Sequence, residues 1–180
     1  MNKLAKNSLA LAAVAALAAT GFISWYLLDR STPSAAGAEP CGPRADVKLF
    51  GHIASLTPSG NNFEVRFDPA WFLSGVTANT AAAEDGAVES GEPVPNDYYV
   101  LEEGHRLLTY LVPSDTHITV LTRGGELDGA GFPSTAITVS QLVQLLDGKE
   151  PVKLAEPLES GLWLRANVDT VCSLEQQYRP

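Results

Sequence analysis

The residues best suited to chemistry lie between positions 95 and 112, in "PNDYYVLEEGHRLLTYLV". Imidazole and carboxylate groups are ordinary zinc ligands, so His105 could hold a metal ion with Glu102 or Glu103. Neighbouring carboxylates could instead hold calcium through their oxygen atoms. The spacing matches neither H-E-x-x-H nor H-x-x-E-H, which favours a plain hairpin tip with Gly104 in the left-handed conformation. We therefore predict no metal and no cofactor, with Glu102, Glu103 and His105 as the alternative metal site.

A second group of reactive residue types follows in "PSDTH", where Ser114, Asp115 and His117 are the ingredients of a hydrolase triad. A triad needs a nucleophile on a rigid elbow and a base oriented by an acid, usually from separate elements. The sequence contains no G-x-S-x-G, and Asp115 fits a turn. No catalytic residue is predicted, and a cryptic hydrolase is the least favoured function.

Two aromatic pairs are better candidates for binding. "DPAWF" follows a predicted strand and "NDYY" follows a proline-rich loop, and Tyr and Trp suit interfaces because each combines an apolar body with a polar tip. A nearby arginine could stack on these rings or pair with local acids. The alternative is that the rings pack inward under a loop. The predicted binding residues are Trp71, Asp97, Tyr99 and Arg106.

The charge of the chain excludes one class of partner. The 180 residues are 45% hydrophobic and 18% charged, as expected of one globular domain, and carry a net charge of −9. Residues 1–38 sum to +2, so the remainder carries −11. A domain this acidic repels phosphate backbones, and we predict no nucleic-acid partner.

The N-terminus predicts a membrane anchor. Residues 1–8 form a short basic lead, and Leu9–Leu28 contains twenty residues without a charge. A helix of that length spans roughly 30 Å, the thickness of the hydrocarbon core of a bilayer. The basic lead places the N-terminus inside and the rest of the chain outside the cell membrane. The alternative is secretion after cleavage of a signal peptide near Ala38, in "SAAGAEP".

The chain has two cysteines, Cys41 and Cys172. In an oxidising compartment such a pair predicts a disulfide bond. In the chain-entropy model a loop of about 130 residues would stabilise the fold by roughly 4–5 kcal/mol. A redox couple or a thiolate metal site is disfavoured because the sequence lacks the local C-x-x-C spacing.

Residues 29–46 read as a linker and residues 47–180 as an extracytoplasmic β domain. Alternation in "FEVRFD" predicts a hairpin over 47–68, and apolar runs predict strands at about 98–102, 106–112 and 117–123, with "EEGH" as the turn between the first two. The alanine run before Gly86 allows a short helix capped by Asn79 or Thr80.

One helix near 139–147 is strongly indicated, because Thr138 and Gln141 have capping-box spacing. A final strand follows in "GLWLRANV". About six strands and one packed helix predict a mainly β fold, a small antiparallel, partly closed barrel like the oligonucleotide/oligosaccharide-binding (OB) fold.

The segments "RFDPAWFLSGVTAN", "PNDYY" and "HRLLTYLVP" resemble a group of uncharacterised exported or membrane-anchored bacterial proteins. The resemblance implies export and brings no activity, cofactor or catalytic residue. The function expected is a membrane-tethered, extracytoplasmic binding or interaction module of the cell envelope, with another envelope protein or a small ligand as partner. A ligand- or metal-binding sensor domain is the alternative.

Overall fold

The structure is a computed structural model that describes residues 47–102, 104, 106–127 and 132–179. The chain divides into two compact units, Met1–Ala38 and Glu39–Pro180, and the fold described below belongs to the second. The predicted lead (1–8), anchor (9–28) and linker (29–46) lie outside the described residues. Among the described residues, no helix combines the length and apolarity needed to cross a membrane.

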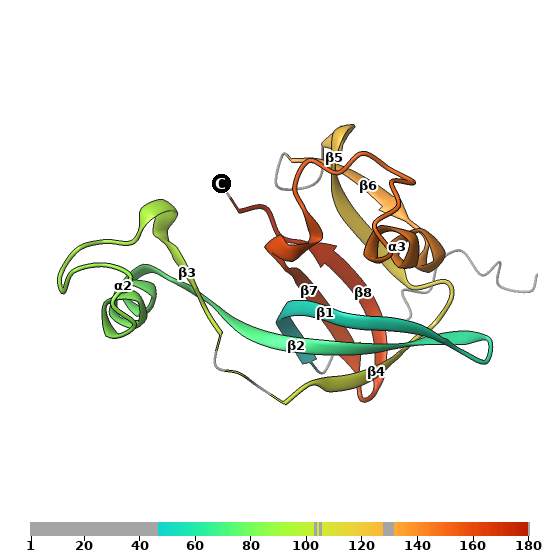
Figure 1. The fold of residues 1–180 in the computed structure, drawn as a ribbon, viewed down its shortest axis with the longest axis horizontal. Helices are drawn as coiled ribbons and strands as arrows, with labels where there is room; N and C mark the ends of the chain where they lie inside the picture. The colour runs from blue at the N-terminus through green and yellow to red at the C-terminus, as the bar shows by residue number, and fades with distance from the viewer. Residues whose placement is uncertain (1–46, 103, 105, 128–131, 180) are drawn as a thin grey trace, which may run out of the picture. The chain divides into compact units, whose positions relative to one another are not determined.

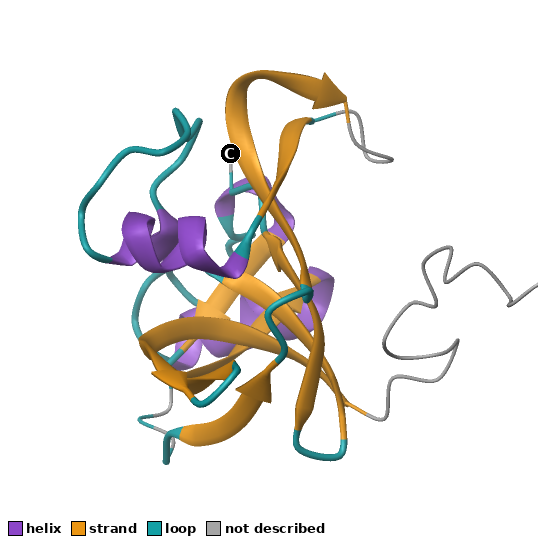
Figure 2. Cartoon of the chain, turned by 90° about the vertical axis from the view of Figure 1, so that its right-hand side faces the viewer, coloured by secondary structure: helices purple, strands orange, loops and turns teal. Residues whose placement is uncertain are grey.

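The fold is mainly β, and five strands close a barrel. They are β1 (Val47–Ser59), β2 (Asn62–Ser74), β4 (Leu108–Val112), β7 (Leu162–Asn167) and β8 (Thr170–Gln176). Around the ring β1 pairs with β2, β2 with β4, β4 with β8, β8 with β7, and β7 with β1. Figure 2 shows how strongly the long strands coil to achieve this closure. The predicted hairpin over 47–68 is confirmed, although both strands are longer than expected.

The seam between β4 and β8 is short. One parallel pair, Leu111 with Thr170, joins the two strands, and the backbone N–H of Leu111 donates to the carbonyl of Asp169 at 2.8 Å. The interior is filled by alternate, inward-facing side chains from all five strands, as the two-residue period of a strand requires. Its fully buried members include Val65, Phe67, Val112, Leu162, Leu164, Val171 and Leu174.

A hairpin and a helix are inserted between β4 and β7. Strand β5 (His117–Leu127) runs parallel to β8 and pairs with β6 (Pro133–Ile137). Helix α3 (Val139–Leu146) follows, which confirms the prediction near 139–147. Its capping box is formed: the Gln141 N–H donates to Thr138 Oγ1 at 3.2 Å, and the Thr138 N–H donates to Gln141 Oε1 at 2.9 Å.

The far half of β2 leaves the barrel and carries a separate substructure, which we call the arm and define as residues 71–102 (Figure 1). After β2 the arm contains α2 (Gly75–Glu84), a 3-10 turn η1 (Pro95–Asp97) and β3 (Tyr98–Leu101). Helix α2 begins after Ser74, so the predicted cap at Asn79 or Thr80 is wrong. The Asn79 side chain instead accepts a hydrogen bond of 2.8 Å from the Val94 N–H.

The predicted hairpin across "EEGH" is also wrong. Strands β3 and β4 pair with successive parts of the same edge of β2, at Trp71–Leu101 and Phe67–Leu108. The two β2 residues are four positions apart, whereas their partners Leu101 and Leu108 are seven positions apart. The segment between β3 and β4 therefore contains three residues more than a continuous strand would need. The segment around Gly104 is therefore a bulge between two strands that both pair with β2, and not a hairpin turn. The sheet has eight strands instead of the predicted six or so.

Candidate functional site

Two of the four predicted binding residues share one face of the arm. In the β2–β3 ladder Trp71 lies opposite Leu101, and Leu73 lies opposite Tyr99. Successive side chains of a strand alternate between faces, so these four lie on the same side. Trp71 is 55% exposed, whereas Tyr99 is half-buried and packs on the small apolar cluster beneath α2.

Tyr99 has a structural partner in the arm. Its hydroxyl donates to Asp85 Oδ2 at 2.9 Å, which connects β3 to the end of α2. That hydrogen bond is the main reason that the pKa of Tyr99 lies above 10.0, with burial and the negative charge of Asp85 adding to it. For Tyr99, the alternative that the rings pack inward therefore fits better than a free contact surface.

The other two predicted binding residues lie elsewhere. Asp97 is exposed in η1 with a φ of 57°, before β3 begins, and Arg106 is exposed after β3 has ended. The four residues of β3 extend about 13 Å at roughly 3.3 Å each. The arm therefore spreads Asp97 and Arg106 apart instead of bringing all four predicted residues around one ligand.

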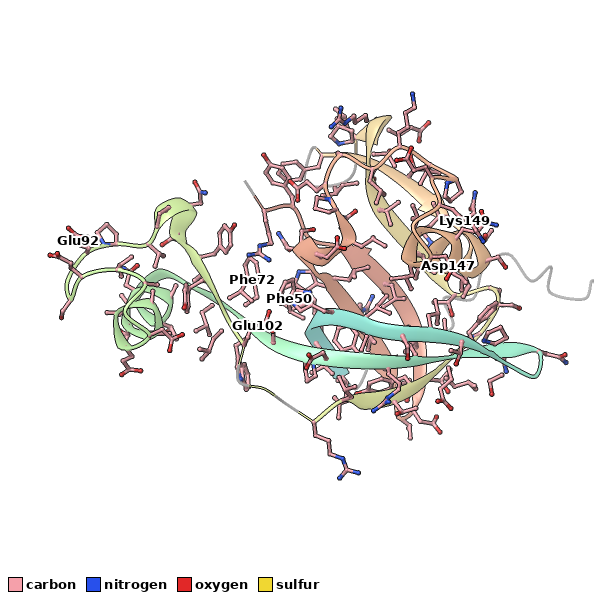
Figure 3. All side chains as sticks on the ribbon, in the orientation of Figure 1. Phe50, Phe72, Glu92, Glu102, Asp147 and Lys149 are labelled. Atoms are coloured by element: carbon pink, nitrogen blue, oxygen red, sulfur yellow. The ribbon has the colours of Figure 1, made fainter. Side chains whose placement is uncertain are left out.

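An aromatic cluster joins the arm to the barrel, and the sequence did not predict it. We call it the aromatic junction: Phe50 of β1, Phe72 of β2, Tyr98 of β3 and Trp163 of β7 (Figure 3 labels Phe50 and Phe72). Phe72 stacks on Tyr98 at 5.2 Å between ring centres, and Phe50 meets Phe72 and Trp163 edge-on at 5.1 and 5.3 Å. These geometries are those preferred by aromatic pairs.

Charged groups surround the aromatic junction. Lys48 Nζ lies 4.4 Å from the ring centre of Trp163, and the Arg179 guanidinium lies 5.8 Å from that of Tyr98. His52 Nε2 and Glu102 Oε1 are 2.8 Å apart, so a hydrogen bond between β1 and the residue that follows β3 adds to the attachment of the arm.

This contact bears on the alternative metal site. Glu102 is engaged with His52, while Glu103 and His105 lie outside the described residues. Within the part of the chain that the structure describes, no group of three or more His, Cys, Asp and Glu side chains is placed to hold a metal ion. The alternative set of Glu102, Glu103 and His105 stays a prediction.

The residues of the possible triad are exposed on the loop and strand after β4. His117 opens β5, and its Nε2 lies 3.1 Å from Thr119 Oγ1, a neighbour on the same face of the strand. Ser114 and Asp115 precede it in a turn whose backbone bond runs from the Thr116 N–H to the Pro113 carbonyl. The geometry fits a turn that starts a strand, and nothing in it orients His117 towards Ser114.

The structure describes one of the two cysteines of the predicted disulfide. Cys172 lies in β8 and is 5% exposed. Cys41 lies outside the described residues, so the pairing of Cys41 with Cys172 stays a prediction.

The arm carries charge of one sign only. Between Trp71 and Glu102 the chain has six acidic residues and no lysine or arginine. The six are Glu84, Asp85, Glu89, Glu92, Asp97 and Glu102. Two apolar side chains are exposed among them, Trp71 at 55% and Val76 at 81%. The arm therefore combines a negative field with apolar contact area.

Comparisons of the chain with protein-family models, with curated proteins and with solved structures gave no match. The similarity of its segments to exported bacterial proteins stays a prediction. The chemistry of the arm and of the barrel is therefore what supports a function.

Proposed function

We propose that the chain is a membrane-tethered, extracytoplasmic binding module of the cell envelope, in which the arm contacts another protein and the barrel is OB-like. The barrel has five strands, and around the closed ring they follow the order β1–β2–β4–β8–β7 instead of their order along the chain. Both features are typical of an OB barrel. The uncharged run Leu9–Leu28 supports the tether.

The observation that carries the proposal is the composition of the arm. Six carboxylates without a cation create a field that attracts and orients a positively charged surface. Exposed Trp71 supplies the kind of anchor that dominates interface energies. The partner that fits is a protein surface rich in lysine and arginine with an apolar recess for the indole.

The arm also contributes little to the barrel core. Its own buried cluster consists of Ala78, Ala82 and Val94, three small side chains. A segment of this length is ordered at a cost in conformational entropy, and so small a core offsets little of that cost. Recognition of a partner gives the arm a role that packing does not.

Two exposed valines provide a matched experiment. A photo-crosslinking amino acid replaces either Val76 on the arm (81% exposed) or Val168 on the barrel (76% exposed) in the full chain, expressed in its native cells. We expect a discrete protein adduct from position 76 and none from position 168. Equal labelling from both positions would contradict the proposal.

The contribution of the negative charges of the arm is tested by the yield of the same crosslinked adduct from position 76. Replacing Glu84, Glu89 and Glu92 by glutamine should abolish it, because three of the six negative charges disappear while the arm keeps its shape. Replacing Glu64 of β2, Glu126 of β5 and Glu175 of β8, all outside the arm, by glutamine is the control with an equal change in net charge. An adduct that survives the arm substitutions rules out electrostatic recognition by the arm.

The tether has its own test. The full chain should stay with membranes during alkaline carbonate extraction, and the unit Glu39–Pro180 expressed with a cleavable signal should not. A mature N-terminus close to Ala38 in the native protein would establish secretion instead.

A further inference from the structure

A pocket of about 500 Å³ opens beside α3. It lies between the end of α3, the chain from Gly148 to Glu159, and Arg123 of β5. The end of α3 is marked in Figure 3 by Asp147 and Lys149. Its volume falls within the roughly 300–1,000 Å³ that is usual for small-molecule sites.

The rim of the pocket is cationic. Arg123, Lys149 and Lys153 line it, which are three of the six basic residues found after residue 103. Glu150 and Glu159 line it as well, so its charge sums to +1 in a chain of −9. Lys149 lies 3.6 Å from Asp147, an exposed pair of the kind that contributes little energy and is readily exchanged for another anion.

Apolar side chains form about half of the pocket lining, among them Leu145, Leu146, Val152, Leu154 and Leu158. A second cavity of about 180 Å³ shares Leu146, Leu158 and Glu159 with the first. It adds His52 and Ile53 of β1 and Leu162 of β7, and both Ile53 and Leu162 belong to the barrel core cluster or pack against it. The two cavities are therefore neighbours that share a wall, with cations at the rim of the first and four apolar side chains, Ile53, Leu146, Leu158 and Leu162, lining the second.

The pocket is built before any ligand arrives. The Arg123 N–H donates to the Lys153 carbonyl at 3.1 Å, and the Ala155 N–H donates to the Leu121 carbonyl at 2.9 Å, which ties this loop to β5. Buried Gln176 donates through Nε2 to the carbonyls of Glu156 and Pro157 at 3.1 and 3.0 Å. Walls held in this way lose little further entropy on binding.

We propose that this pocket binds a single-chain amphiphile with a carboxylate head, of the fatty-acid type. The carboxylate lies among Arg123, Lys149 and Lys153, and the alkyl chain extends past Leu146 and Leu158 into the second cavity. A fully polar anion leaves the apolar walls unused, and a neutral hydrocarbon leaves the cations unused. The proposal is independent of a protein partner for the arm.

The probe is decanoate, titrated calorimetrically into residues 39–180, a unit that closes its barrel around its own core. We expect decanoate to bind, and octanoate to bind about fifteenfold more weakly, because each buried methylene changes affinity about fourfold. Decanol, with the same chain and no charge, should bind at least threefold more weakly than decanoate. Absence of decanoate binding, or equal affinities for decanoate and decanol, would overturn the proposal.

Matched variants locate the site. The double substitution Lys149→Ala and Lys153→Ala should weaken decanoate about threefold to tenfold and leave decanol unchanged, since exposed charge contacts are individually modest. Arg66→Ala removes an exposed cation of β2 away from the pocket and should change neither. If Arg66→Ala weakened decanoate binding more than the double lysine substitution did, decanoate would bind elsewhere.

The apolar lining of the two cavities is tested by a second pair of matched variants. Leu146 is 38% exposed and lines both cavities, and Leu111 on β4 is 36% exposed and lines neither. Leu146→Asp should remove the difference between octanoate and decanoate, whereas Leu111→Asp should preserve it. Melting curves recorded for both variants establish that each is folded, and Leu146→Ser replaces Leu146→Asp where it is not.

A lipid headgroup could supply the same anion, and vesicles separate the two sources. Co-sedimentation of residues 39–180 with phosphatidylglycerol vesicles is compared with phosphatidylcholine vesicles, each with and without decanoate. We expect no retention on either, or retention that decanoate abolishes. Retention on phosphatidylglycerol that decanoate does not reduce would show that the cations serve a membrane surface and would overturn the free-amphiphile site.

Discussion

The barrel and the arm are stabilised by different means. The barrel encloses large, fully buried side chains such as Phe67, Leu162, Leu164 and Leu174. The arm encloses Ala78, Ala82 and Val94, and depends on the aromatic junction for its attachment. The barrel core therefore stabilises the fold, and the surface residues of the arm can vary with little cost to that core.

The two regions also divide the charge. The arm has six acidic residues and no basic one, while three basic side chains gather at the rim of the α3 pocket. Neither pattern follows from packing, because each is carried by exposed side chains. The first pattern underlies the proposed cationic protein partner, and the second underlies the proposed anionic small molecule.

The largest effect should separate the two cores. Leu164→Ala removes a side chain with no exposed area from the barrel and should lower the free energy of unfolding by about 2–5 kcal/mol. Leu73→Ala in the arm, half-buried, should cost about 1 kcal/mol and act locally. Urea unfolding measures the first change and amide hydrogen exchange locates the second. A global loss of equal size from Leu73→Ala would show that the arm belongs to the barrel core.

The features predicted correctly from the sequence are those encoded by residues close together in the chain. Helix α3 and its capping box were predicted because Thr138 and Gln141 are three residues apart, and the β1–β2 hairpin because its turn and alternation are adjacent in the chain. The mainly β barrel followed from counting such strands.

Long-range pairing was not predictable in the same way. The segment around Gly104 has the composition of a turn, yet β3 and β4 both pair with β2. The partners in these ladders are 24 to 49 residues apart in the sequence. The aromatic junction and the α3 pocket have the same origin. Phe50 meets Trp163, and Arg123 meets Lys153, only after register and crossover are known.

Gly161→Ala tests the aromatic junction between the two regions. Gly161 has a φ of 96°, and a β-carbon there would lie 2.4 Å from the Phe50 ring. We expect a loss of about 2–4 kcal/mol, since backbone strain of roughly 1–3 kcal/mol is joined by displacement of Phe50. Gly60→Ala is the control, because its φ is 62° and nothing lies within 4 Å of the new carbon. Near-ultraviolet circular dichroism should change for Gly161→Ala alone, and an unchanged spectrum would mean that the junction adapts.

Helix caps give a smaller contrast. Thr138→Ala removes the Oγ1 atom that accepts from the Gln141 N–H, while the backbone N–H of residue 138 keeps its bond to Gln141 Oε1. The loss should cost about 1 kcal/mol. Ser74→Ala at the start of α2 should cost only a few tenths, because the Ser74 side chain makes no capping hydrogen bond. Thermal unfolding of the two variants measures the difference, and equal losses would refute this ranking.

The smallest expected effect is a dependence on alkaline pH. The hydrogen bond to Asp85 raises the pKa of Tyr99 in the arm, and burial raises the pKa of Tyr110 in the barrel. In both cases the folded state binds the phenolic proton more tightly than the unfolded state, so stability is full below pH 10.0 and falls as the pH rises through the raised pKa.

Tyr99→Phe and Tyr110→Phe separate the two regions on this basis. Amide hydrogen exchange in α2, followed from pH 9 to pH 11, should accelerate in the native chain beyond the intrinsic pH effect and lose that excess in Tyr99→Phe, because the ionising group is gone. Tyr110→Phe should keep the excess in α2 and instead reduce the alkaline loss of global stability, since Tyr110 packs against the barrel core. If Tyr110→Phe removed the excess in α2 as well, arm and barrel would open together, and the independence of the arm would be lost.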